Sequence, residues 1–386
     1  MRVIVSGAIA NKPLNGGEAW VRLSWLLGLR KLGCEVHFME QIHRDTCIDA
    51  AGRPSTFASS LNLAYFRQVV AAFGLEDQAT LMLDEGQEIH GTKYDDLVSL
   101  LESADLLVNI SGHLTNRSLL RRARLKAFID IDPGFTQYWH AAGMAGANVD
   151  GHDVFFTIGE NIGTAACPIP TNGVTWRPIR QPVVLDDWPI AHGATRCERF
   201  TTVANWRGTY GRLEYGGRSF GQKAHEFRKF IDLPRLASPT FEIALDIHPA
   251  DARDRESLLS HGWRLVDPRA ASRDPFAFRR YIQESDAEFS VAQGVYVETM
   301  CGWVSDRTIR YLASGRPALV QDTGFTRLCP IGEGLVPFRT IDEAVNGARR
   351  IQSDYGLHSR TARRIAEQYF DSDRILGDFL AELGVA

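Results

Sequence analysis

The first forty residues alternate between short apolar runs and a longer helical pattern. Val3–Val5 and Glu35–Met39 have the apolar character of buried strands, and apolar residues from Trp20 to Leu27 recur between them at helical spacing. A strand, a helix and a second strand in this order form a βαβ unit. The pattern therefore predicts a parallel sheet with a right-handed crossover.

The same alternation continues along the rest of the chain. We expect further strands at 106–110, 128–131, 154–158, 200–204, 241–245, 263–266, 288–291 and 318–320, and helices at 94–101, 119–125, 223–231, 276–284, 341–353 and 358–383. Prolines between residues 165 and 200 interrupt this order and indicate a connection between two domains. The sequence thus predicts an α/β protein with one parallel-sheet domain over 1–185 and a second over 186–370. Ligands of such sheets bind at the carboxyl ends of the strands, so two facing sheets predict a cleft between the domains.

The segment from Gly302 to Phe325 predicts a loop, a short helix, an abrupt stop and a buried strand. Ser305 or Asp306 can cap the helix start, Gly315 can supply the left-handed residue that ends it, and Pro317 prevents its continuation. The unpaired N–H groups and the dipole of a helix start favour negative charge. Late in a long α/β chain, this segment predicts a pocket for a diphosphate.

Composition narrows the class of protein. Lys and Arg number 43 against 47 Asp and Glu, which gives no support for nonspecific binding to nucleic acid or to an acidic membrane. No apolar run approaches the ~20 residues that span a bilayer, and Met1–Gly7 has the pattern of a strand rather than of a signal peptide. The six cysteines form no C-x-x-C pair, so we expect reduced thiols, no zinc site and a cytoplasmic location.

Together these features resemble the bacterial GT-B-type glycosyltransferases, which use nucleotide sugars. The resemblance covers essentially the whole chain and rests on the loop Asn15-Gly16-Gly17, the proline-rich connection and residues 313–324, which are similar to the A-x-G-x-P-V-V-x-x-x-x-G segment of the family 1- and 4-like group. It implies two facing Rossmann-like domains and a final helix, within 371–386, that crosses back to the first domain. It also implies a UDP- or dTDP-type sugar donor on the second domain, an acceptor on the first, and neither a cofactor nor an essential metal.

The chain departs from the large retaining group of this family at two positions. That group carries glutamates where this sequence has Gly302 and Arg310. The ribose contact is therefore expected at Asp306 or Glu298, and retention of the anomeric configuration does not follow.

The strongest donor-binding prediction is the helix start at Ser305, Asp306 and Arg307, with a capped surface helix as the alternative. Lys223 resembles the donor-phosphate lysine of the family, and Arg207 precedes it in a glycine-rich loop. Two cations near a leaving diphosphate would stabilise the developing charge, whereas solvated surface charge is the other interpretation of Arg207.

Strand ends and turn glycines supply the other donor-binding predictions. His248 follows the strand at 241–245, where a capped turn is the alternative, and Asp322 to Gly324 follow the strand at 318–320, where a tight turn is the alternative. A glycine lets the backbone approach a ligand closely. The predicted residues are Gly16, Gly17, His248, Asp322, Thr323 and Gly324.

A transfer with inversion also needs a base that removes the acceptor proton. His113 ranks first because it follows the strand at 106–110 and the usual pKa of imidazole suits the task. Asp132 ranks second, beside Asp130 at the end of the next strand, and His140 follows them. A purely structural histidine is the competing interpretation of His113.

The predicted activity is transfer of a hexose-type unit from a nucleotide diphosphate sugar to an acceptor. A nucleotide-sugar epimerase of the same fold and a nonenzymatic nucleotide-sugar sensor remain as alternatives. A nicotinamide-dependent oxidoreductase is disfavoured because no G-x-G-x-x-G follows the first strand. The base, the sugar, the acceptor and the oligomeric state stay open.

Overall fold

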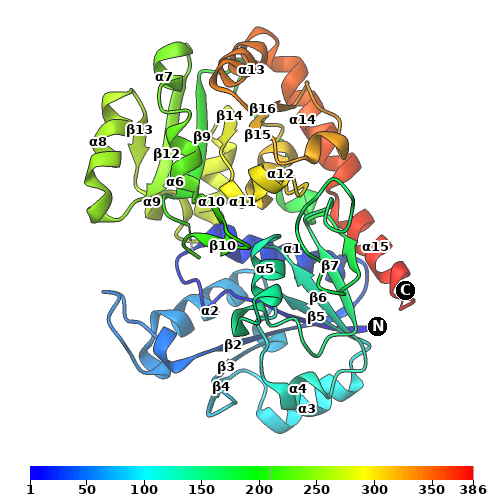
Figure 1. Cartoon of the computed structure of the whole chain (residues 1–386). Helices are drawn as coiled ribbons and strands as arrows, with labels where there is room; N and C mark the ends of the chain where they lie inside the picture. The colour runs from blue at the N-terminus through cyan, green and yellow to red at the C-terminus, as the bar shows by residue number, and fades with distance from the viewer. Residues whose placement is uncertain (209, 386) are drawn as a thin grey trace.

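The computed structural model describes residues 1–208 and 210–385, which fold into two α/β domains that face each other (Figure 1). The first domain has one sheet in the order β4-β3-β2-β1-β5-β6-β7-β8, parallel except where β4 pairs with β3. The strands are β1 (Arg2–Ser6), β2 (Glu35–Ile42), β3 (Ala79–Leu83), β4 (Glu88–His90), β5 (Leu106–Ile110), β6 (Lys126–Asp130), β7 (Val154–Thr157) and β8 (Trp176–Pro178). Its helices are α1 (Gly16–Lys31), α2 (Leu61–Ala72), α3 (Tyr94–Ser103), α4 (Arg117–Leu120) and α5 (Phe135–Ala141).

The second domain has a six-stranded parallel sheet in the order β13-β12-β9-β14-β15-β16. Its strands are β9 (Arg199–Asn205), β12 (Thr240–Asp246), β13 (Arg264–Val266), β14 (Ala287–Ser290), β15 (Ala318–Gln321) and β16 (Leu335–Phe338). A small hairpin of β10 (Leu213–Tyr215) and β11 (Arg218–Phe220) stands apart from the sheet. The helices are α6 (Lys223–Arg228), α7 (Leu233–Leu236), α8 (Ala252–Ser260), α9 (Pro268–Ser272), α10 (Pro275–Gln283), α11 (Gly294–Thr299), α12 (Asp306–Ala313) and α13 (Ile341–Ser353).

The motif in the second half of the chain folds as its residues predict. Ser305 caps α12, since its Oγ accepts the backbone N–H of Arg307 at 3.2 Å, and Gly315 ends the helix with φ +70°. The strand β15 follows directly and is buried along its whole length. The predicted helix, stop and strand are therefore confirmed.

The end of the chain differs from the expectation of two helices, because the segment predicted as 358–383 forms two separate helices. These are α14 (Tyr355–Tyr369) and α15 (Ser372–Glu382). Asp371 breaks the segment, since its side chain caps α15 by accepting the N–H of Asp373. The last helix packs on the first domain, where Phe379 lies 5.3 Å from Trp25 in α1 (Figure 1).

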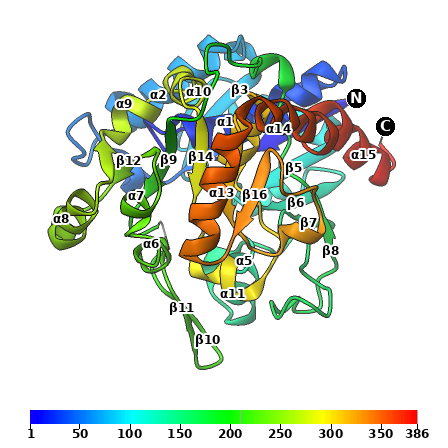
Figure 2. The same cartoon turned by 90° about the horizontal axis from the view of Figure 1, so that it is seen from above.

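The two domains meet where α1 approaches α10 (Figure 2). The indole N–H of Trp20 donates to the carbonyl of Pro275 at 2.7 Å. A Cβ at Gly16 would lie 2.1 Å from the carbonyl oxygen of Asp274, so only glycine fits this contact. None of the helices described here combines the length and the apolar character that crossing a bilayer requires.

Candidate active site between the domains

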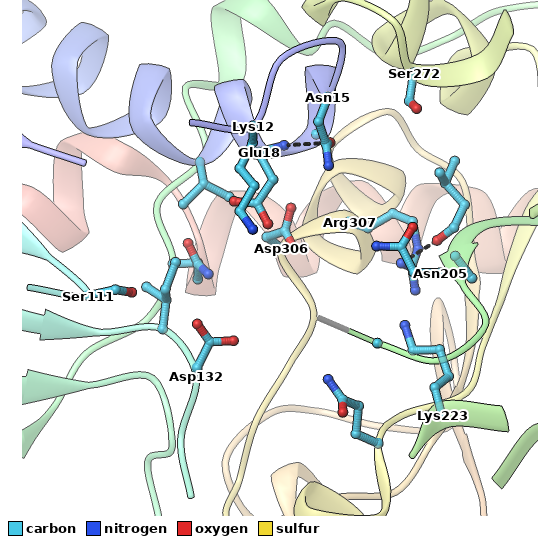
Figure 3. A pocket seen from close by; sticks show the side chains of 18 of the residues that line it. Lys12, Asn15, Glu18, Ser111, Asp132, Asn205, Lys223, Ser272, Asp306 and Arg307 are labelled. Carbon is cyan, nitrogen blue, oxygen red and sulfur yellow. Dashed lines mark hydrogen bonds between the residues drawn. The ribbon is translucent and has the colours of Figure 1, made fainter. Parts of the chain in front are cut away.

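A cleft of about 370 Å³ lies between the carboxyl ends of the two sheets (Figure 3). Its first-domain wall comes from the loops that follow β1, β5 and β6, together with the start of α1. Its second-domain wall comes from the segments that follow β9 and β14 and from the start of α12. The predicted residues that line it are Gly17, His113, Asp132, Lys223, Asp306 and Arg307.

Lys223 supplies a cation on the second-domain wall. It is the first residue of α6, and its side chain points into the cleft beside Arg307 (Figure 3). Burial, together with the charge of Arg307, lowers the pKa of Lys223 to about 7. Among the described residues, none forms an ion pair with this ammonium group. An anion in the cleft would relieve its unfavourable surroundings.

Arg307 is held in place by the sheet behind it. Its Nε donates to Glu288 at 2.7 Å, and its two terminal nitrogens donate to the carbonyl of Val203 at 2.8 Å and to Ser290 at 2.9 Å. Each nitrogen of the guanidinium group therefore has a partner in the protein. The side chain therefore offers a ligand in the cleft its positive charge, because its N–H groups are already used within the protein.

The start of α12 is only partly open to a ligand. Ser305 is buried, and its hydroxyl satisfies one of the free N–H groups of the helix. Asp306 lines the cleft and pairs with Arg310 at 3.3 Å. The fully buried Arg310 also donates to Ser24 of the first domain at 3.2 Å. Arg310 thus connects the two domains.

On the opposite wall, Asp132 and His113 differ in their electrostatics. Burial, together with the charges of Glu18 and Asp130, raises the pKa of Asp132 to about 7. Burial lowers the pKa of His113 to about 3, with the charge of Arg22 as the next cause. At neutral pH His113 is a neutral, weakly basic imidazole, whereas Asp132 exchanges its proton in the range where a general base works best.

Asp130 has a structural role despite its nearness in sequence. It is fully buried and accepts hydrogen bonds from Thr136 at 2.8 Å and from Gln137 and Thr157 at 2.7 Å each. These contacts join the end of β6 to α5 and β7. His140 is likewise not among the described residues that line the cleft.

Arg207 and His248 also lie outside the described lining of the cleft. Arg207 is half-exposed and forms a two-pronged ion pair with Asp251, at 2.7 and 2.9 Å. Nδ1 of His248 accepts the backbone N–H of Ala250 at 3.1 Å. These placements fit the alternatives of a surface charge for Arg207 and of a capped turn for His248.

The other predicted glycines and strand-end residues serve packing, with the exception of Gly17. Asp322 accepts the N–H of Gly324 at 2.8 Å and pairs with Arg339 at 2.7 Å. The hydroxyl of Thr323 donates to the carbonyl of Trp303, and a Cβ at Gly324 would lie 2.5 Å from the carbonyl oxygen of Met300. This is the tight turn given as the alternative above. Gly16 has the same kind of role, because it makes the contact with Asp274 between the domains.

The overall arrangement matches solved structures over their full length. An alpha-glucosyltransferase solved in complex with UDP and a 13-mer DNA containing an HMU base matches with a TM-score of 0.61 and 11% identity, over 100% of this chain and 99% of that one. HepE from Anabaena in complex with UDP-glucose matches with a TM-score of 0.57 and 10% identity, over 100% of both chains. Sucrose-phosphate synthase from Thermosynechococcus elongatus matches with a TM-score of 0.56 and 12% identity, over 99% of this chain and 98% of that one.

The chain has the GT-B fold of glycosyltransferases. Identities this low establish the fold alone. No protein-family model matches the chain, and no curated protein is a significant match.

The GT-B cleft also contains polar residues for which the sequence predicted no site role. From the first domain come Lys12, Asn15, Glu18, Arg22 and Ser111, and from the second come Asn205, Tyr210, Ser272 and Gln293. Lys12, Asn15 and Glu18 lie beside the predicted glycines, so the loop after the first strand was the signal that could have found them. The residues of the second domain follow strand ends without a recognisable motif.

Hydrogen bonds to Glu40 of β2 hold the loop that carries Lys12 at the cleft. This fully buried carboxylate accepts the backbone N–H groups of Ile9, Ala10 and Asn11 at 2.8, 2.7 and 2.7 Å. Three successive amides that converge on one point form an anion-binding nest. Because Glu40 occupies this nest, the backbone there has no free N–H groups for a phosphate, and the cations of the second domain are the better-placed partners.

Proposed function

We propose that the protein is a glycosyltransferase that moves a sugar from a nucleoside diphosphate donor to a hydroxyl of an acceptor. The observation that supports this most is the placement of Lys223 and Asp132 on opposite walls of one cleft (Figure 3). One wall offers a half-buried cation without an ion-pair partner in the described residues, and the other offers a carboxylate with a raised pKa. Such a pair suits a reaction that releases an anion on one side and a proton on the other.

The donor would lie against the second domain, with its diphosphate near Lys223 and the charge of Arg307. These two groups would take over the charge neutralisation that a metal ion provides in other phosphate-binding enzymes. Structures of similar fold contain UDP or UDP-glucose, which supports a UDP-type donor. The acceptor would lie against the first domain, near Asp132 and His113.

The proposed step is a direct displacement at the anomeric carbon. The acceptor oxygen forms a bond to this carbon while the bond from the carbon to the diphosphate oxygen breaks. The bonding electron pair leaves with the diphosphate, whose growing charge Lys223 stabilises, and the acceptor proton passes to the carboxylate of Asp132. We favour Asp132 over His113 as the base because the lowered pKa of His113 makes that imidazole a poor proton acceptor. A single displacement inverts the anomeric configuration, so a product that retains it would exclude this role for Asp132.

The test is a calorimetric titration with UDP, dTDP and GDP, followed by a mass-spectrometric assay of the corresponding sugar nucleotides. We expect micromolar binding of at least one nucleotide and slow release of free sugar and nucleotide without acceptor. Failure of every nucleotide diphosphate to bind would contradict the proposal.

A nucleotide-sugar epimerase is a second candidate because Glu18 and Asp132 both line the cleft, and the charge of Glu18 acts on Asp132. Two carboxylates beside a sugar could shift protons on the donor itself. Product analysis without acceptor separates the two activities. An epimer of the donor sugar would indicate the epimerase, whereas hydrolysis with unchanged sugar would indicate the transferase. A protein that binds donor without either product would be a sensor.

A further inference from the structure

The hydroxyl of Tyr210 reaches across the cleft from the second domain to the first. It lies 3.2 Å from Oδ2 of Asp132, to which it donates a hydrogen bond. Tyr210 belongs to the segment between β9 and the β10–β11 hairpin, whereas Asp132 follows β6. The residue therefore links the two domains at the carboxylate to which the proposed function assigns the base.

The ring of Tyr210 is seated on α5 of the first domain. It lies 5.2 Å from the ring of Phe135 and 4.8 Å from that of Trp139, the latter in an edge-to-face arrangement. Aromatic pairs in such geometries attract each other beyond the burial of their area. Although 41% of Tyr210 is exposed, these contacts give its hydroxyl a defined position.

The β10–β11 hairpin, which follows Tyr210, makes further contacts with α5. The ring of Tyr215 lies 4.8 Å from Tyr138, and the buried Phe220 lies 5.3 Å from the same tyrosine. The segment from β9 to α6 is thus fastened to the first domain at several points. The contact of Tyr210 with Asp132 depends on this closed arrangement of the domains.

The hydrogen bond opposes the other influences on Asp132. Burial and two neighbouring carboxylates raise the pKa of Asp132, whereas the hydroxyl of Tyr210 lowers it by stabilising the ionised form. The charge of Asp132 in turn raises the pKa of Tyr210, so the phenol keeps its proton and remains a donor.

We propose that Tyr210 is a positioning residue that orients the carboxylate of Asp132 from the opposite domain and makes it a competent base when the cleft is closed. The inference rests on the proposed function. Tyr210 binds Oδ2, which leaves Oδ1 of the carboxylate for the acceptor hydroxyl. When the domains separate, Asp132 loses this donor and the orientation that it imposes, so the assistance of Tyr210 to proton removal is restricted to the closed enzyme.

The test compares Tyr210→Phe with Tyr215→Phe in the full chain. Tyr210→Phe keeps the ring on α5 and removes only the hydroxyl, whereas Tyr215→Phe removes a hydroxyl of the same segment that does not contact Asp132. For Tyr210→Phe we expect kcat to fall about tenfold and the acidic limb of the pH profile of kcat/KM to move up by about one pH unit. The KM for the donor should change little. Tyr215→Phe should leave all three unchanged.

A second measurement does not need turnover. The carboxyl carbon of Asp132 can be followed by NMR in protein labelled at aspartate, with Asp132→Asn to assign the signal. Its titration midpoint should rise in Tyr210→Phe and stay in place in Tyr215→Phe. An unchanged midpoint and an unchanged pH profile would overturn the inference. If the wild type turns over no sugar nucleotide but the midpoint shifts, the proposed function fails while the contact between Tyr210 and Asp132 stands.

Discussion

Asp130 and Asp132 are separated by one residue at the end of β6, but only Asp132 lines the cleft. Asp132→Asn should lower turnover by about 10²–10⁴, the usual contribution of a general base, while nucleotide binding is retained. Asp130→Asn should instead destabilise the protein by about 1–3 kcal/mol. The NH2 group of asparagine replaces one of the two carboxylate oxygens, each of which accepts two hydrogen bonds, and it cannot accept them. Activity assays and urea unfolding of both variants check this. A stable, fully active Asp132→Asn would remove the residue from the mechanism.

The pH dependence of kcat/KM distinguishes the two candidate bases. The pKa of Asp132 is raised to about 7, so activity that depends on its ionised form should increase as the pH rises through about 7. The pKa of His113 is lowered to about 3, so activity that depends on its neutral form should be constant from about pH 5 upward. We expect the first profile, and an acidic limb that disappears in Asp132→Asn. A flat profile between pH 5 and 8 would favour His113.

Nucleotide affinity should depend on pH through Lys223. Its pKa is lowered to about 7 in the free protein, and a bound diphosphate would raise it. Binding above pH 7 therefore takes up a proton, and affinity should fall as the pH rises from 7 to 9. Lys223→Met should weaken UDP binding about ten- to a hundredfold at pH 6.5 and abolish the proton uptake.

Calorimetry in two buffers of different ionisation enthalpy measures this proton uptake. Lys229→Met is the matched control, because this lysine pairs with Glu226 and is more than half exposed.

The substitution Lys223→Met should weaken nucleotide binding but increase the stability of the fold. Since the pKa of Lys223 is lower in the folded state, charging it opposes folding below about pH 7, and Lys223→Met should be more stable than the wild type at pH 6.

Glu40→Gln should loosen the loop that carries Lys12. The amide group of glutamine would meet at least one of the N–H groups of Ile9, Ala10 and Asn11, so we expect a loss of about 1–3 kcal/mol in the free energy of unfolding. Glu35→Gln, on the same strand, should lose less than about 1 kcal/mol because its ion pair with Arg2 is exposed. Urea titration of the two variants would show this difference, and equal losses would mean that Glu40 does not anchor the loop.

The features predicted correctly from the sequence are those that neighbouring residues determine. The cap at Ser305, the stop at Gly315 and the strand β15 all depend on residues within one segment. Lys223 was predicted at the start of a helix. It is the first residue of α6, and it lines the cleft.

The predictions that the structure does not support involve partners from distant segments. Asp322 forms an ion pair with Arg339, which follows β16, and Arg207 forms one with Asp251, which follows β12. No local sequence pattern indicates either pair. The glycine at 16 was expected at a ligand, but the backbone that approaches it belongs to Asp274 of the other domain. No local pattern indicates Tyr210 either, since its hydrogen-bond partner is an aspartate 78 positions earlier in the chain.

The bare backbone contact at Gly16 has a mechanical consequence. Nothing larger than a hydrogen atom fits between the domains there, so a single methyl group introduced by Gly16→Ala would act as a wedge. A shift of the backbone at Gly16 would also move Glu18, because both residues lie in the first turn of α1 and Glu18 lines the cleft. A substitution at Gly16, which lines no part of the cleft, can thus change how far the two domains close. It would favour an open form of the protein in which every residue of the cleft is unchanged.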